Sequence, residues 1–387
     1  MTRRLRIAML AHSTNPRGGV VHALQLSEAL FDLGHEVVLH APDPFGHGFF
    51  RPARCGLEAF PVEAACAGLT AMVEQRIEDY VRYFEQCGTD QFDLFHAHDG
   101  ISGNAMATLK QRGVVPGYLR TVHHIDTFTD PRLDALQARS IDHADGLFTV
   151  SDYWRNWFLA QHRNATCVGN GVDVARFKPE RDEHDLRLAE AYSQGRGPVY
   201  LAIGGVEERK NTLGILKAFA QVLAVRPDAR LWIAGGVSLL DHSVYQAAFA
   251  AELASVPNLG AAVTFLGRVA DEDMPALFRS ADALVFPSLV EGFGLVVLEA
   301  MASGVPVVLS SILPFTDYVP TDAAIWCDPF KPSSIAEAML NVLSNSVRQR
   351  CVDAGQRVAQ RHDWRSVALA HLPTYQQSID LKEMAHA

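Results

Sequence analysis

The chain has 387 residues, more than twice the length of a common domain, so the sequence predicts two domains, each large enough for its own core. Hydrophobic residues make up 48% of the chain and charged residues 20%, which is typical of an ordinary soluble globular protein. The formal net charge of −10 argues against a surface built to hold nucleic acid or anionic lipid.

The six cysteines are scattered, with no C-x-x-C spacing and no tight cluster with histidines. This favours a reduced cytoplasmic chain over a disulfide framework or a zinc site. The start MTRRLRIAML joins basic residues to a short apolar run, but AHSTNPRGG interrupts it at once, so it predicts a buried strand rather than a signal peptide. No run approaches the ~20 apolar residues of a membrane span, and no transmembrane segment is expected.

Short apolar runs alternate with longer helix-period segments along both halves of the chain, as in β-α-β units around parallel sheets. In the first half, strands are predicted at 5–10, 35–41, 92–98, 117–123 and 146–151. In the second half, they are predicted at 199–205, 229–236, 262–267, 283–288 and 305–311. The fold class expected is therefore α/β, with two doubly wound, Rossmann-like domains.

The domain boundaries follow from composition. Residues 1–175 and 199–362 are the two predicted domains, the charged and apolar-poor stretch 176–198 is the predicted linker, and 363–387 is a predicted helix whose apolar positions pack on another element. Each half also opens in the same way, as a strand, a polar or glycine-bearing loop and a helix N-terminus. Such an opening is a place where free amides and the helix dipole hold an anion.

The segment LVEGFGLVVLEA (289–300) sets Glu291 and Glu299 seven residues apart. In one continuous helix these residues would be separated by ~12 Å along the axis, farther than the ~5 to 9.5 Å between the carboxyls of a glycoside hydrolase. Glycines on both sides of Phe293 instead predict a helix that begins after it, with Glu291 on a loop and Glu299 about one turn inside. The segment is then predicted to bind a polar, partly anionic molecule. The alternative is that Glu299 has no binding role and merely lies on a helix that follows a glycine loop.

The surrounding run 263–311, with its two glutamates and EAMASGVPVV, resembles the C-terminal signature of the family-4 retaining glycosyltransferases. NPRGGVVHALQLSEALFDLGHEV (15–37) is similar to the first loop and helix of that family. VGNGVDVARFKP (168–179) is similar to its interdomain segment, and the tail with Trp364 to the helix that crosses back to the N-terminal domain. The resemblance covers nearly the whole chain.

This resemblance implies the GT-B fold, in which two doubly wound domains face each other across a cleft. Members move a sugar from a nucleotide diphosphate sugar to an acceptor and keep the anomeric configuration, usually without a bound metal. No cofactor is therefore expected. The base (UDP, GDP or ADP) and the acceptor (a small molecule, lipid or glycan) stay open.

The resemblance also implies roles for the residues of the glutamate segment. Glu299 would hold the ribose hydroxyls of the donor, and Glu291 would face the transferred sugar. The backbone amides that would lie against the sugar and diphosphate are those of Gly292, Phe293, Gly294 and Leu295.

Cations are needed wherever a diphosphate leaves without a metal. In the loop GGVEERKN (204–211), Lys210 matches the family's lysine, but Gly205 stands where the family has an arginine, and Arg209 is the next basic candidate. This departure keeps open a nucleotide-sugar-binding protein with little transferase activity. Near the start of the chain, Gly18 and Gly19 precede the first helix and resemble the loop that approaches the donor.

Histidines follow two neighbouring strands of the first half. His96 and His98 share one face of a strand end, and His123 follows the next strand, which together suggest a metal-dependent hydrolase as an alternative. The family resemblance instead implies that His123 lies beside the reacting sugar, while His98 and Asp99 shape the acceptor side or are structural.

Three further segments have simpler expectations. The D-x-D-like triplet 271–273 precedes a helix and is predicted to cap it. The amphipathic stretch 71–88 is acidic and is predicted to be a core-facing helix rather than a membrane-surface one. Residues 42–60 are predicted to be a loop that selects the acceptor.

Overall fold

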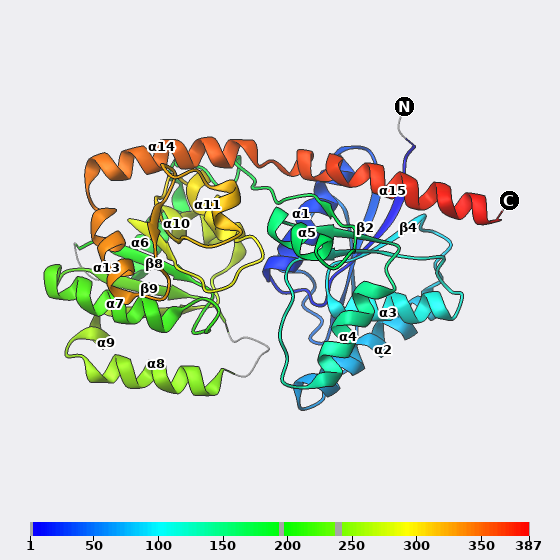
Figure 1. The fold of residues 1–387 in the computed structure, drawn as a ribbon, viewed down its shortest axis with the longest axis horizontal. Coiled ribbons are helices and arrows are strands. Elements are labelled where there is room, and N and C mark those ends of the chain that lie inside the picture. The colour runs from blue at the N-terminus through cyan, green and yellow to red at the C-terminus, as the bar shows by residue number, and fades with distance from the viewer. Residues whose placement is uncertain (1–2, 193–196, 237–241, 387) are drawn as a thin grey trace. The chain divides into compact units, whose positions relative to one another are not determined.

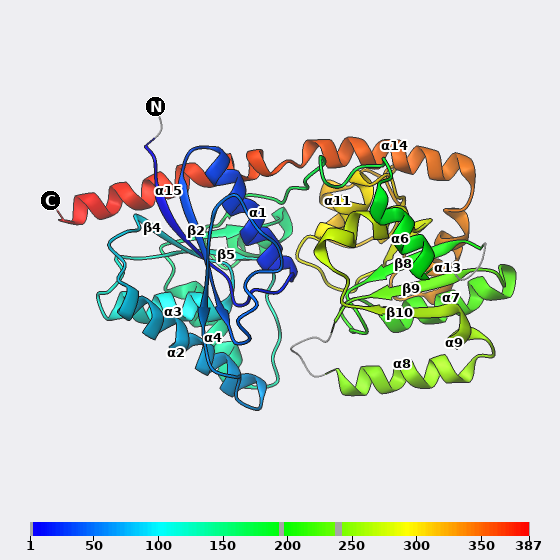
Figure 2. The same cartoon turned by 180° about the vertical axis from the view of Figure 1, so that it is seen from behind.

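The computed structural model describes residues 3–192, 197–236 and 242–386. The chain divides into two compact units, which Figures 1 and 2 show from opposite sides. Unit 1 comprises Met1–Asn170 and Trp364–Ala387, and unit 2 comprises Gly171–Asp363. The first boundary therefore lies five residues before the predicted one at 175, and the predicted C-terminal helix belongs to unit 1.

Unit 1 is built on a seven-stranded parallel sheet with the order β3-β2-β1-β4-β5-β6-β7. Its strands are β1 (Arg6–Leu10), β2 (Glu36–Asp43), β3 (Gly56–Pro61), β4 (Leu94–Ala97), β5 (Leu119–Val122), β6 (Gly146–Thr149) and β7 (Thr166–Cys167). Its helices are α1 (Gly18–Asp32), α2 (Leu69–Cys87), α3 (Gly100–Gln111), α4 (Pro131–Asp142), α5 (Asp152–Leu159) and α15 (Trp364–His386).

The two faces of the unit 1 sheet differ in chemistry. On one face, Phe95 packs in an apolar core with Tyr80 and Phe84 of α2. Alternate strand residues point to opposite sides, so His96 faces the other way, where its Nδ1 lies 2.7 Å from the hydroxyl of Tyr375 on α15. Helix α1 packs along α15 over this face (Figure 1), and β4 therefore presents its histidines to these two helices.

Unit 2 is built on a six-stranded parallel sheet with the order β10-β9-β8-β11-β12-β13. Its strands are β8 (Val199–Ile203), β9 (Arg230–Ala234), β10 (Val263–Gly267), β11 (Ala283–Phe286), β12 (Val307–Ser310) and β13 (Ile325–Cys327). Its helices are α6 (Glu183–Tyr192), α7 (Thr212–Val225), α8 (Ser243–Ser255), α9 (Leu259–Ala262), the 3₁₀ turn η1 (Asp271–Asp273), α10 (Met274–Arg279), α11 (Leu295–Ala302), α12 (Phe315–Tyr318), α13 (Pro332–Asn341) and α14 (Asn345–Arg361).

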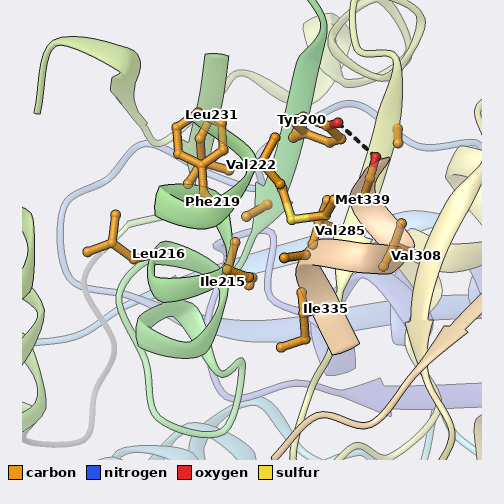
Figure 3. Close-up of a cluster of buried hydrophobic side chains, with 14 of the residues drawn as sticks. Tyr200, Ile215, Leu216, Phe219, Val222, Leu231, Val285, Val308, Ile335 and Met339 are labelled. Atoms are coloured by element: carbon orange, nitrogen blue, oxygen red, sulfur yellow. Dashed lines mark hydrogen bonds between the residues drawn. The ribbon is translucent and has the colours of Figure 1, made fainter. Parts of the chain in front are cut away.

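One apolar core joins the unit 2 sheet to α7 and α13, as Figure 3 shows. Phe219 and Val222 of α7 contact the same cluster as Met339 of α13, and all three are fully buried. The hydroxyl of Tyr200 on β8 enters this cluster and donates a hydrogen bond of 2.7 Å to the backbone oxygen of Met339. On the opposite face α14 packs on α11, where a Cβ on Gly355 would lie 2.9 Å from the Met301 side chain.

The ten predicted strands all form, but three further strands do not follow from the sequence patterns. β7 and β13 contain two and three residues, which is too short for a hydrophobic period to be recognised. β3 lies at the edge of its sheet within 42–60, a segment predicted to be a loop, and only Phe60 of its residues is buried. The prediction of an entirely irregular segment there is wrong, because an edge strand shows little of the apolar signal that identifies a central one.

The predicted linker 176–198 is also not a linker where the structure describes it, which is as far as residue 192 and from 197. It contains α6, whose Leu188 is buried. The charges that suggested a solvated linker are paired within unit 2, since Arg279 of α10 contacts Asp185 at 2.6 Å and Asp182 at 2.9 Å. The composition was therefore misleading, because two of the acidic residues in this stretch, Asp182 and Asp185, pair with a buried arginine.

The amphipathic stretch 71–88 corresponds to α2, and its Tyr80, Val81 and Phe84 are buried in the unit 1 core as predicted. In the described part of the chain, no helix is both long enough and apolar enough to cross a membrane.

Candidate active site

Each sheet has one place where the strand order reverses direction. It lies between β1 and β4 in unit 1 and between β8 and β11 in unit 2. Loops leave such neighbouring strands in opposite directions and open a crevice at their carboxyl ends, where ligands bind in open α/β sheets. Most predicted site residues follow one of these four strands, and each unit is described in turn.

In unit 2, the loop after β8 is tied to the loop after β11. The backbone oxygen of Arg209 accepts a hydrogen bond of 2.9 Å from the Leu289 amide. The Asn211 side chain donates to the backbone oxygens of Pro287 at 3.1 Å and Pro329 at 2.7 Å. These bonds bring the loop that carries the two cations against the loop that carries Glu291.

Glu291 is the centre of an ion-pair cluster. Its Oε1 lies 2.9 Å from Nη1 of Arg209, its Oε2 lies 2.5 Å from Nζ of Lys210, and the side chain is almost fully buried. Glu207 completes the cluster and accepts from Nε of Arg209 at 3.0 Å. Burial alone would lower the pKa of Arg209, but the carboxylates of Glu291 and Glu207 raise it above its ordinary value. The cluster joins two carboxylates to two cations and is balanced in charge.

Lys210 is the more strongly desolvated of the two cations. Burial lowers its pKa, and the Glu291 carboxylate acts in the opposite direction. The ammonium group also lies 4.5 Å from the ring centre of Phe286, within the range of a cation–π contact. The Lys210 ammonium group thus contacts one carboxylate and one aromatic face. An anion that binds it would do so away from bulk water.

Gly205 explains the departure from the family's arginine in physical terms. Its φ is +72°, and a Cβ there would lie 3.0 Å from the backbone oxygen of Gly236. Gly204 has a φ of +129°, and its Cβ would lie 2.7 Å from the side chain of Lys210. A side chain on either glycine would be strained, so this backbone path presents its cations from Arg209 and Lys210 instead.

Helix α11 begins at Leu295, after Phe293 as predicted, and Glu291 lies on the loop that precedes it. Gly294 has a φ of +92°, and a Cβ there would lie 2.8 Å from the ring of Phe315. Phe293 is held in place by Tyr318, whose ring stacks on it at 4.3 Å and whose hydroxyl donates to its backbone oxygen at 2.9 Å. No side chain caps this helix among the residues the structure describes, and its first amides, beginning at Leu295, remain available to an anion.

Glu299 lies on α11 and is separate from the cation cluster. Its half-buried carboxylate makes no hydrogen bond or ion pair to any residue that the structure describes. Burial raises its pKa to about 7, Arg176 acts to lower it, and Asp271 acts to raise it. A carboxylate without a partner is a strong acceptor for ligand hydroxyl groups.

The triplet 271–273 does not cap α10 as predicted. Asp273 stands at the N-cap position of α10, but its side chain makes no cap hydrogen bond. Asp271 instead pairs with Arg176 at 2.8 Å, and Asp273 lies 3.0 Å from Nδ1 of His184. Asp271 and Asp273 therefore have basic partners distant in the chain, which a local cap pattern does not show.

In unit 1, His123 lies against the first turn of α1. A Cβ on Gly19 would lie 3.3 Å from its Cδ2, whereas a Cβ on Gly18 would meet nothing within 4 Å. Gly18 and Gly19 were predicted to precede the helix, but they are its first two residues. His123 Nε2 is buried and has no hydrogen-bond partner in the described ranges, and burial holds its pKa well below the ordinary value.

His98 and Asp99 lie beside this group. The ring of His98 is 5.7 Å from that of His123, and its Nε2 lies 2.8 Å from the sulfur of Met9. Asp99 caps α3 by accepting from the amide of Ser102 at 2.8 Å. The cap is a structural role for one carboxylate oxygen, while the other is buried without a hydrogen bond in the described part.

His96 does not fit a metal site. Its Nδ1 is 2.7 Å from the Tyr375 hydroxyl and its Nε2 is 2.7 Å from the Thr121 hydroxyl, so both ring nitrogens are engaged. Among the described residues, no three histidine, cysteine, aspartate or glutamate side chains are grouped to hold a metal ion. The structure therefore gives no support to the hydrolase alternative with His96, His98 and His123.

Two family models match the chain. The model described as Glycosyltransferase Family 4 matches residues 16–176, and the model described as Glycosyl transferases group 1 matches residues 189–358. The chain belongs to the family-4 glycosyltransferases. It is therefore a transferase, and a binding protein without transfer is the weaker alternative.

Named relatives agree with this membership. A phosphatidyl-myo-inositol mannosyltransferase of Mycobacterium tuberculosis is 28% identical over 96% of this chain and 97% of its own length. The O-antigen chain mannosyltransferase B of Escherichia coli is 29% identical over 66% of this chain and 69% of its own length.

Solved glycosyltransferase structures show the same fold. Sucrose-phosphate synthase from Thermosynechococcus elongatus has a TM-score of 0.79 at 21% identity and covers 98% of this chain and 100% of that chain. Anabaena HepE in complex with UDP-glucose has a TM-score of 0.76 at 17% identity and covers 97% and 100%. The predicted fold class, a GT-B glycosyltransferase with two Rossmann-like domains, is confirmed.

The structure brings together most of the predicted glycosyltransferase residues within each unit. Arg209, Lys210, Glu291 and Gly292 form one group in unit 2, and the Gly292 amide lies 3.2 Å from the Glu291 carboxylate. Glu299 stands apart from that group. Their assignments to donor and acceptor stay predictions.

Sequence reasoning did not single out four residues that complete these groups, namely Glu207, Tyr318, His22 and Asn170. In unit 1 the ring of His22 lies 4.9 Å from that of His123, and its Nδ1 is 2.5 Å from Oδ1 of Asn170. Glu207 stands two residues before Arg209 in a charged run, so only its contact distinguishes it from its neighbour Glu208. His22 has a weak sequence signal, because it follows Gly18 by four residues and shares a helix face with it.

Proposed function

We propose that this glycosyltransferase is a retaining enzyme that moves a sugar from a nucleotide diphosphate sugar to an acceptor hydroxyl without a bound metal. The observation that carries the proposal is the group of Arg209, Lys210 and the uncapped α11 N-terminus at the reversal point of the unit 2 sheet. A leaving diphosphate gains negative charge, and these cations and amides supply the stabilisation that a metal would otherwise give.

In this proposal, donor binding rearranges the ion pairs of Glu291. The diphosphate takes over Arg209 and Lys210, and it replaces the Glu291 carboxylate as their anionic partner. Glu291 then accepts hydrogen bonds from the sugar hydroxyls and stabilises positive charge on the ring in the transition state. Glu207 keeps its contact to Nε of Arg209 and orients the guanidinium toward the phosphates.

Glu299 is proposed to hold the ribose of the donor. Its carboxylate is half-buried and unpaired among the described residues, and two ribose hydroxyls would supply the donors that it lacks. Binding would also favour the ionised form, because a carboxylate accepts hydrogen bonds better than a carboxylic acid does.

Transfer would proceed on the face from which the nucleotide leaves. The acceptor oxygen forms a bond to the anomeric carbon while the bond from that carbon to the diphosphate oxygen breaks, and the acceptor proton passes to the departing phosphate. His123 of unit 1 is neutral, because burial holds its pKa well below the ordinary value, so it would support the transition state by hydrogen bonding rather than by charge.

The first donors to test come from the relatives. HepE was solved with UDP and with UDP-glucose, and the relatives named above include mannosyltransferases. A thermal-shift panel of UDP, GDP, ADP and their sugars therefore comes first. A donor at 100 times its Kd stabilises the folded protein by about 2.7 kcal/mol, which is a measurable rise in Tm.

Two variants separate binding from chemistry. Glu299→Ala should weaken nucleotide binding, whereas His123→Ala should mainly lower turnover. Glu337→Ala is the matched control, because it removes an exposed carboxylate from α13 of the same unit. Equal donor affinity in the wild type and Glu299→Ala would refute the ribose assignment. Loss of activity with a chelator, restored by a stoichiometric metal, would refute metal independence.

A further inference from the structure

His22 lies at the centre of a cluster of aromatic rings in unit 1. It is on the second turn of α1 and is fully buried. Its ring centre is 4.9 Å from that of His123, 5.3 Å from that of His98 and 5.2 Å from that of Trp364. No role has been assigned to it so far, although it touches both histidines that the family resemblance singled out.

A hydrogen bond to Asn170 fixes the tautomer of His22. Nδ1 of the ring lies 2.5 Å from Oδ1 of Asn170, which is 148 residues away in the sequence. An amide oxygen only accepts, so Nδ1 carries the proton and Nε2 presents a lone pair. Burial lowers the pKa of His22 to about 4, and the ring is therefore neutral at physiological pH.

The cluster has a second property that points to a ligand. Nε2 of His22, Nδ1 of His98 and Nε2 of His123 are all buried without a hydrogen-bond partner in the described part of the chain. Buried polar atoms are almost always satisfied, because leaving them unpaired is costly. Three such atoms on rings in mutual contact, beside the half-exposed first turn of α1 at Gly19, indicate partners that arrive with a ligand.

We propose that His22, His98 and His123 form a subsite of unit 1 that binds the hydroxyl groups of an uncharged polyol or sugar. The subsite would be the acceptor end of the transfer reaction, and this reading rests on the proposed function. Within it, His22 Nε2 accepts a hydrogen bond from one acceptor hydroxyl, and Asn170 is a positioning residue that keeps the lone pair on that nitrogen.

The chemistry of the cluster favours hydroxyls over phosphate. Neutral imidazoles both donate and accept hydrogen bonds, as hydroxyls do, but they carry no charge to offset an anion. Among the charged groups, Arg120 acts on the ring of His123, and the Asp99 carboxylate in turn acts on Arg120 and offsets its charge. The Arg120 guanidinium is itself buried, and its Nη1 donates to the backbone oxygen of Thr121, while its Nε has no hydrogen-bond partner among the described residues.

Two substitutions of His22 separate the two ring nitrogens. In His22→Asn, the shorter amide reaches the place of Nδ1 and keeps a donor for Asn170, but nothing replaces Nε2. In His22→Gln, the longer amide places an acceptor near the position of Nε2. We expect His22→Asn to weaken polyol binding about tenfold and His22→Gln to retain more of it. A purely structural role through Asn170 predicts the reverse order.

The probes are glucose and glucose 6-phosphate, added to the full-length protein labelled with 15N at histidine. The wild type should show His22 protonated at Nδ1, and glucose should shift the Nε2 resonance. His22→Asn should weaken both sugars by the same factor, since only a hydroxyl contacts His22. A larger loss for glucose 6-phosphate would overturn the uncharged subsite, and an unchanged Nε2 resonance with both probes at saturation would overturn the binding role.

The kinetic test distinguishes this inference from the proposed function. With a donor found by the nucleotide panel, His22→Asn should lower kcat/KM for the sugar acceptor by a larger factor than it lowers hydrolysis of the donor in the absence of acceptor. An equal loss of both activities in His22→Asn would assign His22 to the protein core. If the wild type binds no nucleotide, the proposed function fails, and the NMR result with glucose still decides the subsite.

Discussion

The two units differ in the polar side chains that they bury at the carboxyl edges of their sheets: those of unit 1 are mainly neutral histidines, and those of unit 2 are mainly charged and paired. Unit 1 places neutral histidines at the carboxyl edge of its sheet, and burial keeps their pKa values low. Unit 2 places charged side chains at the corresponding edge and pairs Glu291 with Arg209 and Lys210. One edge therefore offers hydrogen bonds without charge and the other offers charge, which suits an acceptor hydroxyl and a diphosphate respectively.

A fall in pH should produce a larger difference in stability between the two units than any single substitution does. Six histidines of unit 1 have folded pKa values well below the unfolded value, namely His22, His40, His96, His98, His123 and His371. Below the unfolded pKa of about 6.5 the unfolded chain binds more protons, so each residue removes about 1.4 kcal/mol of stability per pH unit. At pH 5.5 the sum is about 8 kcal/mol, comparable to the whole stability of a domain.

Unit 2 should survive the same acid step. Burial raises the pKa of Asp185, but its bonds to Arg279 lower it more. The stability that Asp185 contributes to unit 2 is therefore lost only when the pH falls below its unfolded pKa of about 3.9. Hydrogen exchange measured by mass spectrometry at pH 7 and 5.5 resolves the units. His40→Phe should shift the acid transition of unit 1 to lower pH, and His47→Phe, at an exposed site, serves as control. Simultaneous opening of both units would contradict the comparison.

Removal of one charge in unit 2 should have the next largest effect. Lys210→Met keeps an apolar side chain of similar length but deletes the ammonium group over Phe286. Loss of one such group from the leaving diphosphate typically costs about 10²- to 10³-fold in turnover. Steady-state kinetics with the identified donor measures it. Lys217→Met, at an exposed position of α7, is the control. An unchanged kcat/KM in Lys210→Met would place the diphosphate elsewhere.

The contrast between the units follows only partly from the sequence. Strands such as 5–10 and 283–288 are short, mainly apolar runs, and GFG before an apolar helix predicts that Glu291 lies on a loop, so these features are local and predictable. The partners are not local, since Glu291 meets Arg209 across 82 residues and His22 meets Asn170 across 148. A pattern that spans a few residues carries no information on which distant side chain neutralises a charge or fixes a tautomer.

Glu299 should respond to pH in the opposite direction from the histidines of unit 1. Its folded pKa of about 7 lies above the unfolded value, so its contribution to stability is full below pH 4.5 and is lost as pH rises through 7. Glu299→Gln should therefore stabilise unit 2 by about 2 kcal/mol at pH 8 and have little effect at pH 5. Denaturant unfolding without nucleotide at both pH values tests this. Equal shifts at pH 5 and pH 8 would show that burial does not disfavour the charged form.

The smallest effect should come from one methyl group in unit 1. Gly18→Ala and Gly19→Ala both replace a glycine in the first turn of α1 and share a helix-propensity gain of up to about 1 kcal/mol. Only the Gly19 methyl approaches the His123 ring, at 3.3 Å, so the difference between the two variants isolates that contact.

We expect Gly19→Ala to be less stable than Gly18→Ala by about 1 kcal/mol, because the ring must shift by a few tenths of an ångström in a packed site. The shift should also move the His123 imidazole resonances in Gly19→Ala and leave them in place in Gly18→Ala. Since misplacement of a positioned group lowers turnover steeply, kcat should fall about tenfold in Gly19→Ala. A displaced ring with unchanged kcat would mean that His123 takes no part in the reaction and that unit 1 only binds the acceptor. A fall in kcat would show that the neutral His123 ring of unit 1 also acts in the transition state.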